Sequence, residues 1–108
     1  MDELHHYLLT APTGHGYMHC YVMTNDRKKV MAAASQMLDT IAEKDPSPVN
    51  VILDTLLNPD GVKVVRDRID RDFPEAAAML KTATDFHYSA WMDMPSDSPD
   101  NAQLLELH

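Results

Sequence analysis

The spacing of apolar residues changes near Thr24, and this change constrains the fold of the 108-residue chain more than any other feature. Segments 4–10 and 17–23 read as extended strands, in which alternate residues face opposite sides, and the second is rich in aromatic and β-branched types. Between them, residues 11–16 (APTGHG) carry the proline and glycines typical of a turn. We therefore predict a β-hairpin whose core face carries Met18, Cys20 and Val22.

Beyond Thr24 the apolar residues recur every three or four positions, which is the spacing of one helix face. They predict a helix that is capped by Thr24 or Asn25, ends near Lys44 and buries Val30, Ala33, Ala34, Met37, Leu38 and Ile41. Three cations at 27–29 open this helix and oppose its dipole. We interpret these cations as part of a solvated turn. The alternative is that they interact with a group outside the helix.

Proline-containing breaks divide the rest of the chain. At 47–48 and at 58–59, a residue suited to an N-cap precedes a proline suited to the first helical turn. At 72–75, an acid is followed three residues later by Glu, the spacing of a capping box. We predict helices over about 48–57, 59–72 and 73–92, with a buried strand over 49–53 as the alternative to the first.

These elements predict an α+β fold, in which an N-terminal two-stranded antiparallel β-hairpin packs on a bundle of about four α-helices. The composition, 44% hydrophobic and 24% charged residues, suits one globular domain and excludes disordered, collagen-like and coiled-coil chains. We place this domain at 1–94. Residues 95–108 are predicted to be a polar, mobile tail, whose last four residues (LELH) read as a possible remnant of a cloning tag.

Three features of the sequence predict a cytoplasmic protein that does not contact a membrane. One cysteine, Cys20, allows no internal disulfide. No stretch approaches the roughly 20 apolar residues that cross a bilayer. The start of the chain, Met1-Asp2-Glu3, is acidic where a signal peptide is basic.

The sequence lacks the motifs of nucleotide-binding loops, serine hydrolases and zinc proteases, and three glycines cannot build a phosphate cradle. We therefore predict no enzyme activity, no cofactor and no metal. The alternative is a small histidine-dependent enzyme or metal-binding protein, in which His15, His19 and either His5 or His6 meet in the hairpin. Cys20 does not join His19 in such a site, because neighbouring strand residues point to opposite faces.

Segment 47–72 suggests a helix-turn-helix, and its second helix carries Lys63, Arg66, Arg68 and Arg71. The same helix contains four aspartates that cancel these charges: Asp60, Asp67, Asp70 and Asp72. The formal net charge of the chain is −8, which repels a phosphate backbone. A nucleic-acid-binding regulator is therefore the less favoured alternative, and the alternating charges are typical of a solvated helix face.

Acidity beside large aromatic residues favours binding to another protein. Residues from 51 onward hold 11 acids and 5 bases, and no base follows Asp93. Tyr and Trp are enriched at the centres of interfaces, and acids steer basic partners toward a surface. We predict an inhibitor or adaptor, for example a phage- or plasmid-type regulator of a host factor. Its partner would be a protein with a basic surface, bound through Tyr17, Tyr21, Tyr88, Trp91, Asp93, Asp97 and Asp100.

Two further hypotheses concern exposed surfaces. The open edges of a two-stranded ribbon, together with exposed Tyr17 and Tyr21, predict a homodimer. Trp91 is either the last member of a helical stripe that begins at Ala76 or the anchor of an interface. The continuity of that stripe favours the core.

Overall fold

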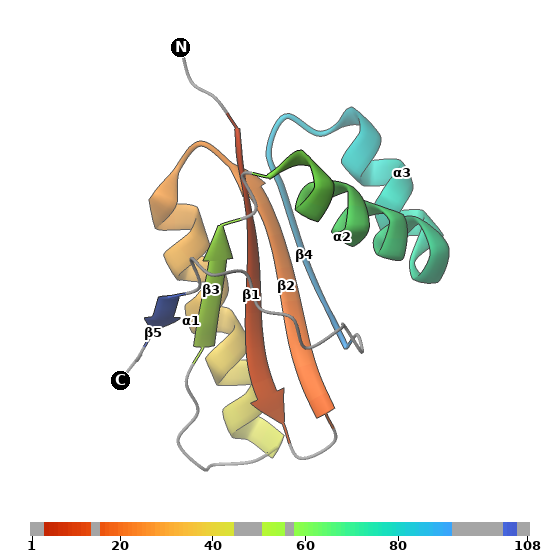
Figure 1. Cartoon of the computed structure of the whole chain (residues 1–108). Helices are drawn as coiled ribbons and strands as arrows, with labels where there is room; N and C mark the ends of the chain where they lie inside the picture. Colours follow the sequence, from red (N-terminus) through yellow and green to blue (C-terminus); the bar gives the residue numbers. More distant parts are fainter. Residues whose placement is uncertain (1–3, 14–15, 45–50, 56–57, 92–102, 106–108) are drawn as a thin grey trace.

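The computed structural model describes residues 4–13, 16–44, 51–55, 58–91 and 103–105. In this part of the chain, five strands form one antiparallel sheet in the order β4-β2-β1-β3-β5, and three helices pack on its faces (Figure 1). The predicted α+β class is confirmed. In chain order the elements are β1 (His5–Thr13), β2 (Gly16–Thr24), α1 (Arg27–Lys44), β3 (Val51–Thr55), α2 (Pro59–Asp72), α3 (Pro74–Thr82), β4 (Phe86–Trp91) and β5 (Gln103–Leu105).

The predicted β-hairpin is present, and it forms the centre of the sheet. β1 and β2 pair from His5 opposite Thr24 to Thr13 opposite Gly16, so both strands extend into the segment expected to turn. Pro12 lies beyond the part of β1 that also pairs with β3, and proline is tolerated where a strand is not paired on both sides.

Helix α1 forms where the apolar stripe predicts it, but its N-cap differs. Asp26 precedes the first helical residue, and its Oδ1 accepts a hydrogen bond from the backbone N–H of Lys28 at 2.9 Å. Thr24 Oγ1 accepts from the N–H of Asp26 at 3.1 Å. Asp26, rather than Thr24 or Asn25, therefore caps α1, and its carboxylate offsets the cations that follow.

The helix α1 covers one face of the sheet. The buried residues on this side are Leu9, Ala11, Met18, Cys20 and Val22 of the strands and Val30, Ala33, Ala34, Met37 and Ile41 of the helix. The core face predicted for the second strand is therefore confirmed.

Helices α2 and α3 cover the opposite face (Figure 1). There Leu8, Tyr21, Met23 and Phe86 of the sheet pack against Val65, Ile69, Ala76, Ala77 and Leu80 of the helices. The expectation that Tyr21 is exposed is wrong, since only 1% of the residue is exposed. The reason is that each face of the hairpin has its own helical layer.

The helix predicted over 48–57 is wrong, and the strand alternative is correct. β3 (Val51–Thr55) pairs antiparallel with β1, from Tyr7 opposite Thr55 to Thr10 opposite Ile52. A short apolar run suits a strand and a helix alike, and here the pairing with β1 decides between them. Because this segment is a strand, 47–72 does not form a helix-turn-helix.

Helix α2 begins as predicted. Asn58 Oδ1 accepts a hydrogen bond from the backbone N–H of Asp60 at 2.9 Å, and Pro59 lies in the first turn. A proline at this position costs no hydrogen bond, because the first N–H groups of a helix have no partner within it.

The helix predicted over 73–92 is also wrong, because the segment forms two elements. α3 ends at Thr82, and β4 pairs with β2 from Met23 opposite Phe86 to Met18 opposite Trp91. Residues four apart share a face in a strand as well as in a helix, so the stripe ending at Trp91 did not distinguish the two. The N-cap of α3 is Phe73 without a side-chain hydrogen bond, and the capping box is not formed.

The predicted two-stranded hairpin on a four-helix bundle is therefore replaced by a sheet between helical layers. β4 pairs with the outer edge of β2, and β3 pairs with the outer edge of β1. The open edges of the hairpin, on which the predicted homodimer was based, are therefore covered within the chain. β5, within the predicted tail at 95–108, pairs with β3. The rest of that tail lies outside the described residues. None of the described helices is long and apolar enough to cross a membrane.

Candidate ligand-binding site

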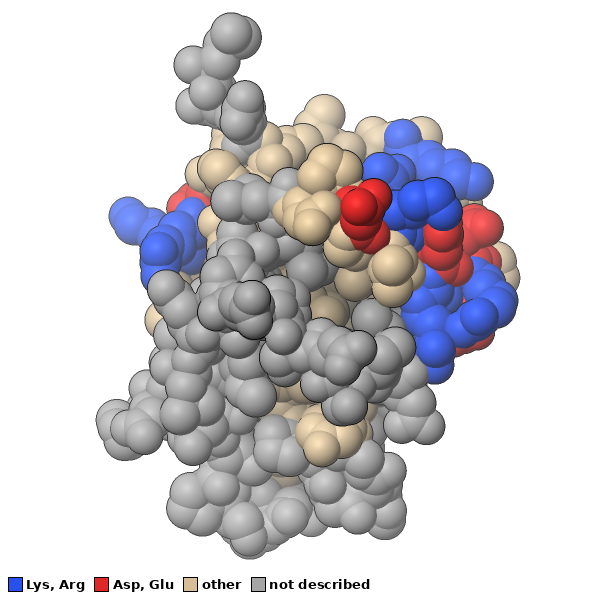
Figure 2. All heavy atoms as spheres, viewed as in Figure 1, with Lys and Arg blue, Asp and Glu red and all other residues tan. Residues whose placement is uncertain are grey.

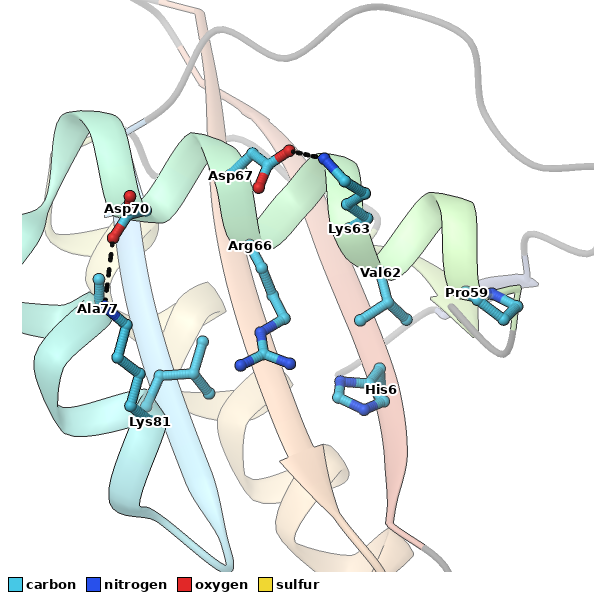
Figure 3. Close-up of a pocket in the computed structure, with 10 residues that line it drawn as sticks. His6, Pro59, Val62, Lys63, Arg66, Asp67, Asp70, Ala77 and Lys81 are labelled. Atoms are coloured by element: carbon cyan, nitrogen blue, oxygen red, sulfur yellow. Dashed lines mark hydrogen bonds and ion pairs between the residues drawn. The ribbon is translucent and has the colours of Figure 1, made fainter.

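A cavity of about 650 Å³ opens between α2, α3 and the start of β1 (Figure 3). This volume lies within the range of roughly 300–1,000 Å³ that is usual for ligand pockets. The cavity is lined by His6, Pro59, Val62, Lys63, Arg66, Asp67, Asp70, Ala77, Leu80 and Lys81.

The periodicity of α2 supplies one wall of the cavity. Val62, Arg66 and Asp70 follow one another at intervals of four residues and so lie along one side of the helix. Val65 and Ile69, one residue before Arg66 and Asp70, are buried against the sheet. The hydrophobic contact that fixes α2 on the sheet therefore also fixes the direction of the polar wall.

The Arg66 side chain reaches from α2 into the space between His6 and Lys81 (Figure 3). No ion pair joins it to a carboxylate among the described residues. Asp70 lies four residues after Arg66, which is the usual spacing for an ion pair on a helix. In the structure, however, Asp70 lies toward Lys81 of α3, with 3.9 Å between Oδ1 and Nζ.

The other charges that line the cavity are paired. Lys63 Nζ lies 2.6 Å from Asp67 Oδ2, and the hydrogen bond raises the pKa of this exposed lysine. With Lys81 facing Asp70, three cations and two carboxylates line the cavity and leave one positive charge, that of Arg66.

His6 is connected to the buried layer beneath the cavity. A hydrogen bond joins its Nδ1 to the hydroxyl of Tyr21. Burial lowers the pKa of His6, and the charge of Arg66 and the neighbouring His5 lower it further. Burial also raises the pKa of Tyr21 to about 12, although Arg66 opposes this shift. Both groups are therefore uncharged at neutral pH.

Figure 2 shows the Lys and Arg atoms of the α2–α3 layer interleaved with Asp and Glu. Residues 59–82 hold five bases and five acids. Besides the pairs at the cavity, Arg68 Nε lies 2.8 Å and Arg71 Nε 3.1 Å from oxygens of Asp72. This layer is thus a balanced, solvated surface, with the Arg66 guanidinium directed into the cavity.

The residues predicted to bind a partner do not form one exposed surface among the described residues. Tyr17 is 52% exposed, whereas Tyr21 is buried. Tyr88 lies opposite Tyr21 in β4 and packs on Phe73, with 5.4 Å between ring centroids. Trp91 is opposite Met18 in the sheet register, but its side chain lies outside the described part, as do three acids of the predicted set: Asp93, Asp97 and Asp100.

Among the described residues, the histidines of the hairpin do not meet. Nδ1 of His19 lies 3.0 Å from the hydroxyl of Thr10, its partner in the register. His5 and His6 are four to five residues further along the paired strands, about 13–17 Å away at strand spacing. The described residues contain no group of side chains suited to a metal ion, and His15 lies outside them. Cys20 is buried against α1, and burial raises its pKa to about 12.

Sequence reasoning missed the cavity because its walls come from distant segments. His6 belongs to β1 and Lys81 to α3, and nothing in the local pattern of either residue indicates that they approach Arg66. No family model matches this chain, and comparison with curated proteins and with solved structures finds no significant match.

Proposed function

We propose that this protein binds a small anionic ligand in the cavity between β1, α2 and α3, with Arg66 as the anchor. The observation that carries the proposal is a guanidinium that lines a cavity of about 650 Å³ without an ion-pair partner among the described carboxylates. A guanidinium presents a planar set of N–H donors that matches a carboxylate or a phosphate in a bidentate arrangement.

His6 supports the same chemistry. Tyr21 retains its proton at neutral pH, and we assign its hydroxyl as the donor to Nδ1 of His6. The proton of the neutral imidazole is then on Nε2. Arg66 and His6, the two polar groups of the cavity outside its ion pairs, both offer N–H donors. A site of this kind selects ligands that accept hydrogen bonds and carry negative charge.

Titration of the isotope-labelled protein with acetate, followed by NMR, tests this function. We expect saturable shifts of the Arg66 and His6 side-chain signals. Arg66→Gln should weaken binding by about tenfold or more, since a charge-assisted hydrogen bond is replaced by a neutral one. Arg27→Gln is the matched control, because Arg27 is an exposed arginine of α1 that does not line the cavity. Equal acetate affinity in Arg66→Gln and Arg27→Gln would refute the proposal.

A second candidate function is binding to a protein with a basic surface, and the distribution of charge favours it. The structure describes the side chains of eight acids and eight bases, whose formal charges cancel. The other nine acids and one base therefore account for the whole net charge of −8. Four of those acids are in residues 92–108, which contain no base: Asp93, Asp97, Asp100 and Glu106. Negative charge is thus concentrated outside the described part, which is neutral. Such a concentration of negative charge favours electrostatic steering of a basic partner.

Association with a polylysine-coated surface at two salt concentrations tests the second candidate. We expect the on-rate to fall as salt rises, and to fall at fixed salt when Asp93, Asp97 and Asp100 are changed together to Asn. The control removes the same charge from the described part through Asp39→Asn, Asp60→Asn and Glu75→Gln. If the two triple variants slow association equally, only net charge matters and residues 93–100 are not the binding segment.

A further inference from the structure

We propose that the ligand of the cavity is an organic monocarboxylate with an apolar body, and this inference rests on the proposed anion-binding function. Three properties of the cavity indicate this class of ligand: its apolar walls, its single uncompensated positive charge, and a volume larger than an inorganic ion needs.

The apolar walls lie on both sides of the anchor. Four of the ten lining residues are apolar, and they come from the start of α2 and from α3: Pro59, Val62, Ala77 and Leu80. In Figure 3, Pro59 and Val62 lie on one side of Arg66, and Ala77 lies on the other side next to Lys81.

These walls are continuous with the hydrophobic core. Ala77 and Leu80 belong to the buried cluster beneath α2 and α3, and Val62 packs against that cluster. A ligand whose carboxylate meets Arg66 therefore places its body against side chains held by the core. Burying apolar surface of the ligand there adds binding energy that an inorganic anion cannot gain.

The charge of the cavity favours one negative charge over two or more. Asp67 and Asp70 line the same cavity as Arg66 and remain within reach of Lys63 and Lys81. A monocarboxylate neutralises the one positive charge left by these pairs. A second negative charge on the ligand would face the two aspartates, which costs energy through like-charge repulsion. Phosphate monoesters and polyphosphates carry more than one negative charge and are disfavoured for the same reason.

A series of straight-chain carboxylates from acetate to octanoate, measured by NMR titration at one pH and one salt concentration, tests the inference. We expect the affinity to rise about two- to fourfold for each added methylene until the apolar walls are covered. Inorganic phosphate should bind more weakly than octanoate. Octanol, which has the same body without the charge, should also bind more weakly.

Two variants of α2 assign the effect to the walls. Val62→Ser makes one wall polar and should reduce the gain in affinity per added methylene. Val64→Ser is the matched control, because Val64 is 54% exposed and does not line the cavity, and it should keep the full chain-length dependence.

The possible results separate this inference from the function on which it rests. If acetate, octanoate and phosphate bind equally well, the anion-binding function stands, and the inference that the ligand is a monocarboxylate with an apolar body is wrong. If phosphate binds and no carboxylate does, only the inference is wrong. If octanol binds as tightly as octanoate, or if neither a carboxylate nor phosphate binds, both are wrong. If Val64→Ser abolishes the chain-length dependence and Val62→Ser does not, the apolar body lies elsewhere and the inference fails.

Discussion

The hydroxyl of Tyr21 and Nδ1 of His6 form a hydrogen bond that connects the buried face of the sheet to the wall of the cavity. The two residues are diagonal neighbours on β1 and β2, because the register places His6 opposite Met23 and Tyr21 opposite Leu8. Tyr21 is held by the core, with Phe86 at a ring-centroid distance of 6.2 Å. A buried residue that does not line the cavity therefore holds His6 in its orientation in the candidate site.

Tyr21→Phe should destabilise the fold by about 1–2 kcal/mol, because it removes a buried hydrogen bond and leaves Nδ1 of His6 without that partner. Urea denaturation followed by circular dichroism measures the change in the free energy of unfolding. Tyr17→Phe removes the same hydroxyl from an exposed tyrosine and should change stability by less than about 0.5 kcal/mol. Equal effects of the two substitutions would show that the bond to His6 contributes nothing.

The stability of the protein should fall as the pH drops below about 6.5, the ordinary pKa of histidine. Burial lowers the pKa of both His6 and His87 in the folded state, so the unfolded chain takes up protons in a pH range where the folded chain does not. The loss of stability levels off below the folded-state pKa values.

Urea denaturation at a series of pH values between about 5 and 8 tests this dependence. His6→Gln and His87→Gln should each reduce the slope of stability against pH below about 6.5 and leave the slope above about 7 unchanged. A slope that is the same in the wild type and in the double variant would contradict the assignment to these two histidines.

The ion pair between Lys29 and Asp85 should contribute little to stability. It joins the first turn of α1 to the residue before β4, with side chains 57% and 37% exposed. Exposed pairs are typically worth less than about 1 kcal/mol and weaken as salt rises. Asp85→Asn should therefore cost under about 1 kcal/mol at low salt and less at high salt. Asp39→Asn, an exposed acid of α1 without an ion pair among the described residues, is the control.

Local chemistry was sufficient to predict the elements whose ends are marked in the sequence. The hairpin, α1 and α2 each combine a consistent period with recognisable ends, such as the Asn58-Pro59 start of α2. The sequence offered β3 only as an alternative to a helix and did not indicate β4, because the assignment of both strands depends on pairing with β1 and β2, which are more than 40 residues away in sequence. With β3 and β4 on either side of the hairpin, the sheet has two apolar faces, and each is covered by helices. The helices therefore form two separate layers rather than the predicted bundle.

The candidate site was less predictable than the fold. The sequence placed Arg66 in a helix with as many acids as bases, where pairing with Asp70 is the natural expectation. Only the packing of α3 against α2 brings Lys81 toward Asp70 and leaves Arg66 beside His6. The partner-binding residues chosen from composition include Tyr21, which packing has buried.

The pKa of His6, measured by NMR with and without saturating octanoate, tests the central claim most directly. His6 lies between the hydroxyl of Tyr21 and the charge of Arg66, next to His5, and shares the cavity with the paired Lys63 and Asp67. Burial is the largest cause of the lowered pKa of His6 and the charge of Arg66 is the next, and a carboxylate bound to Arg66 offsets that charge. We therefore predict that octanoate raises the pKa of His6 and leaves that of His87, which does not line this cavity, unchanged. An unchanged His6 pKa under saturating octanoate, or an equal shift at His87, would contradict the account.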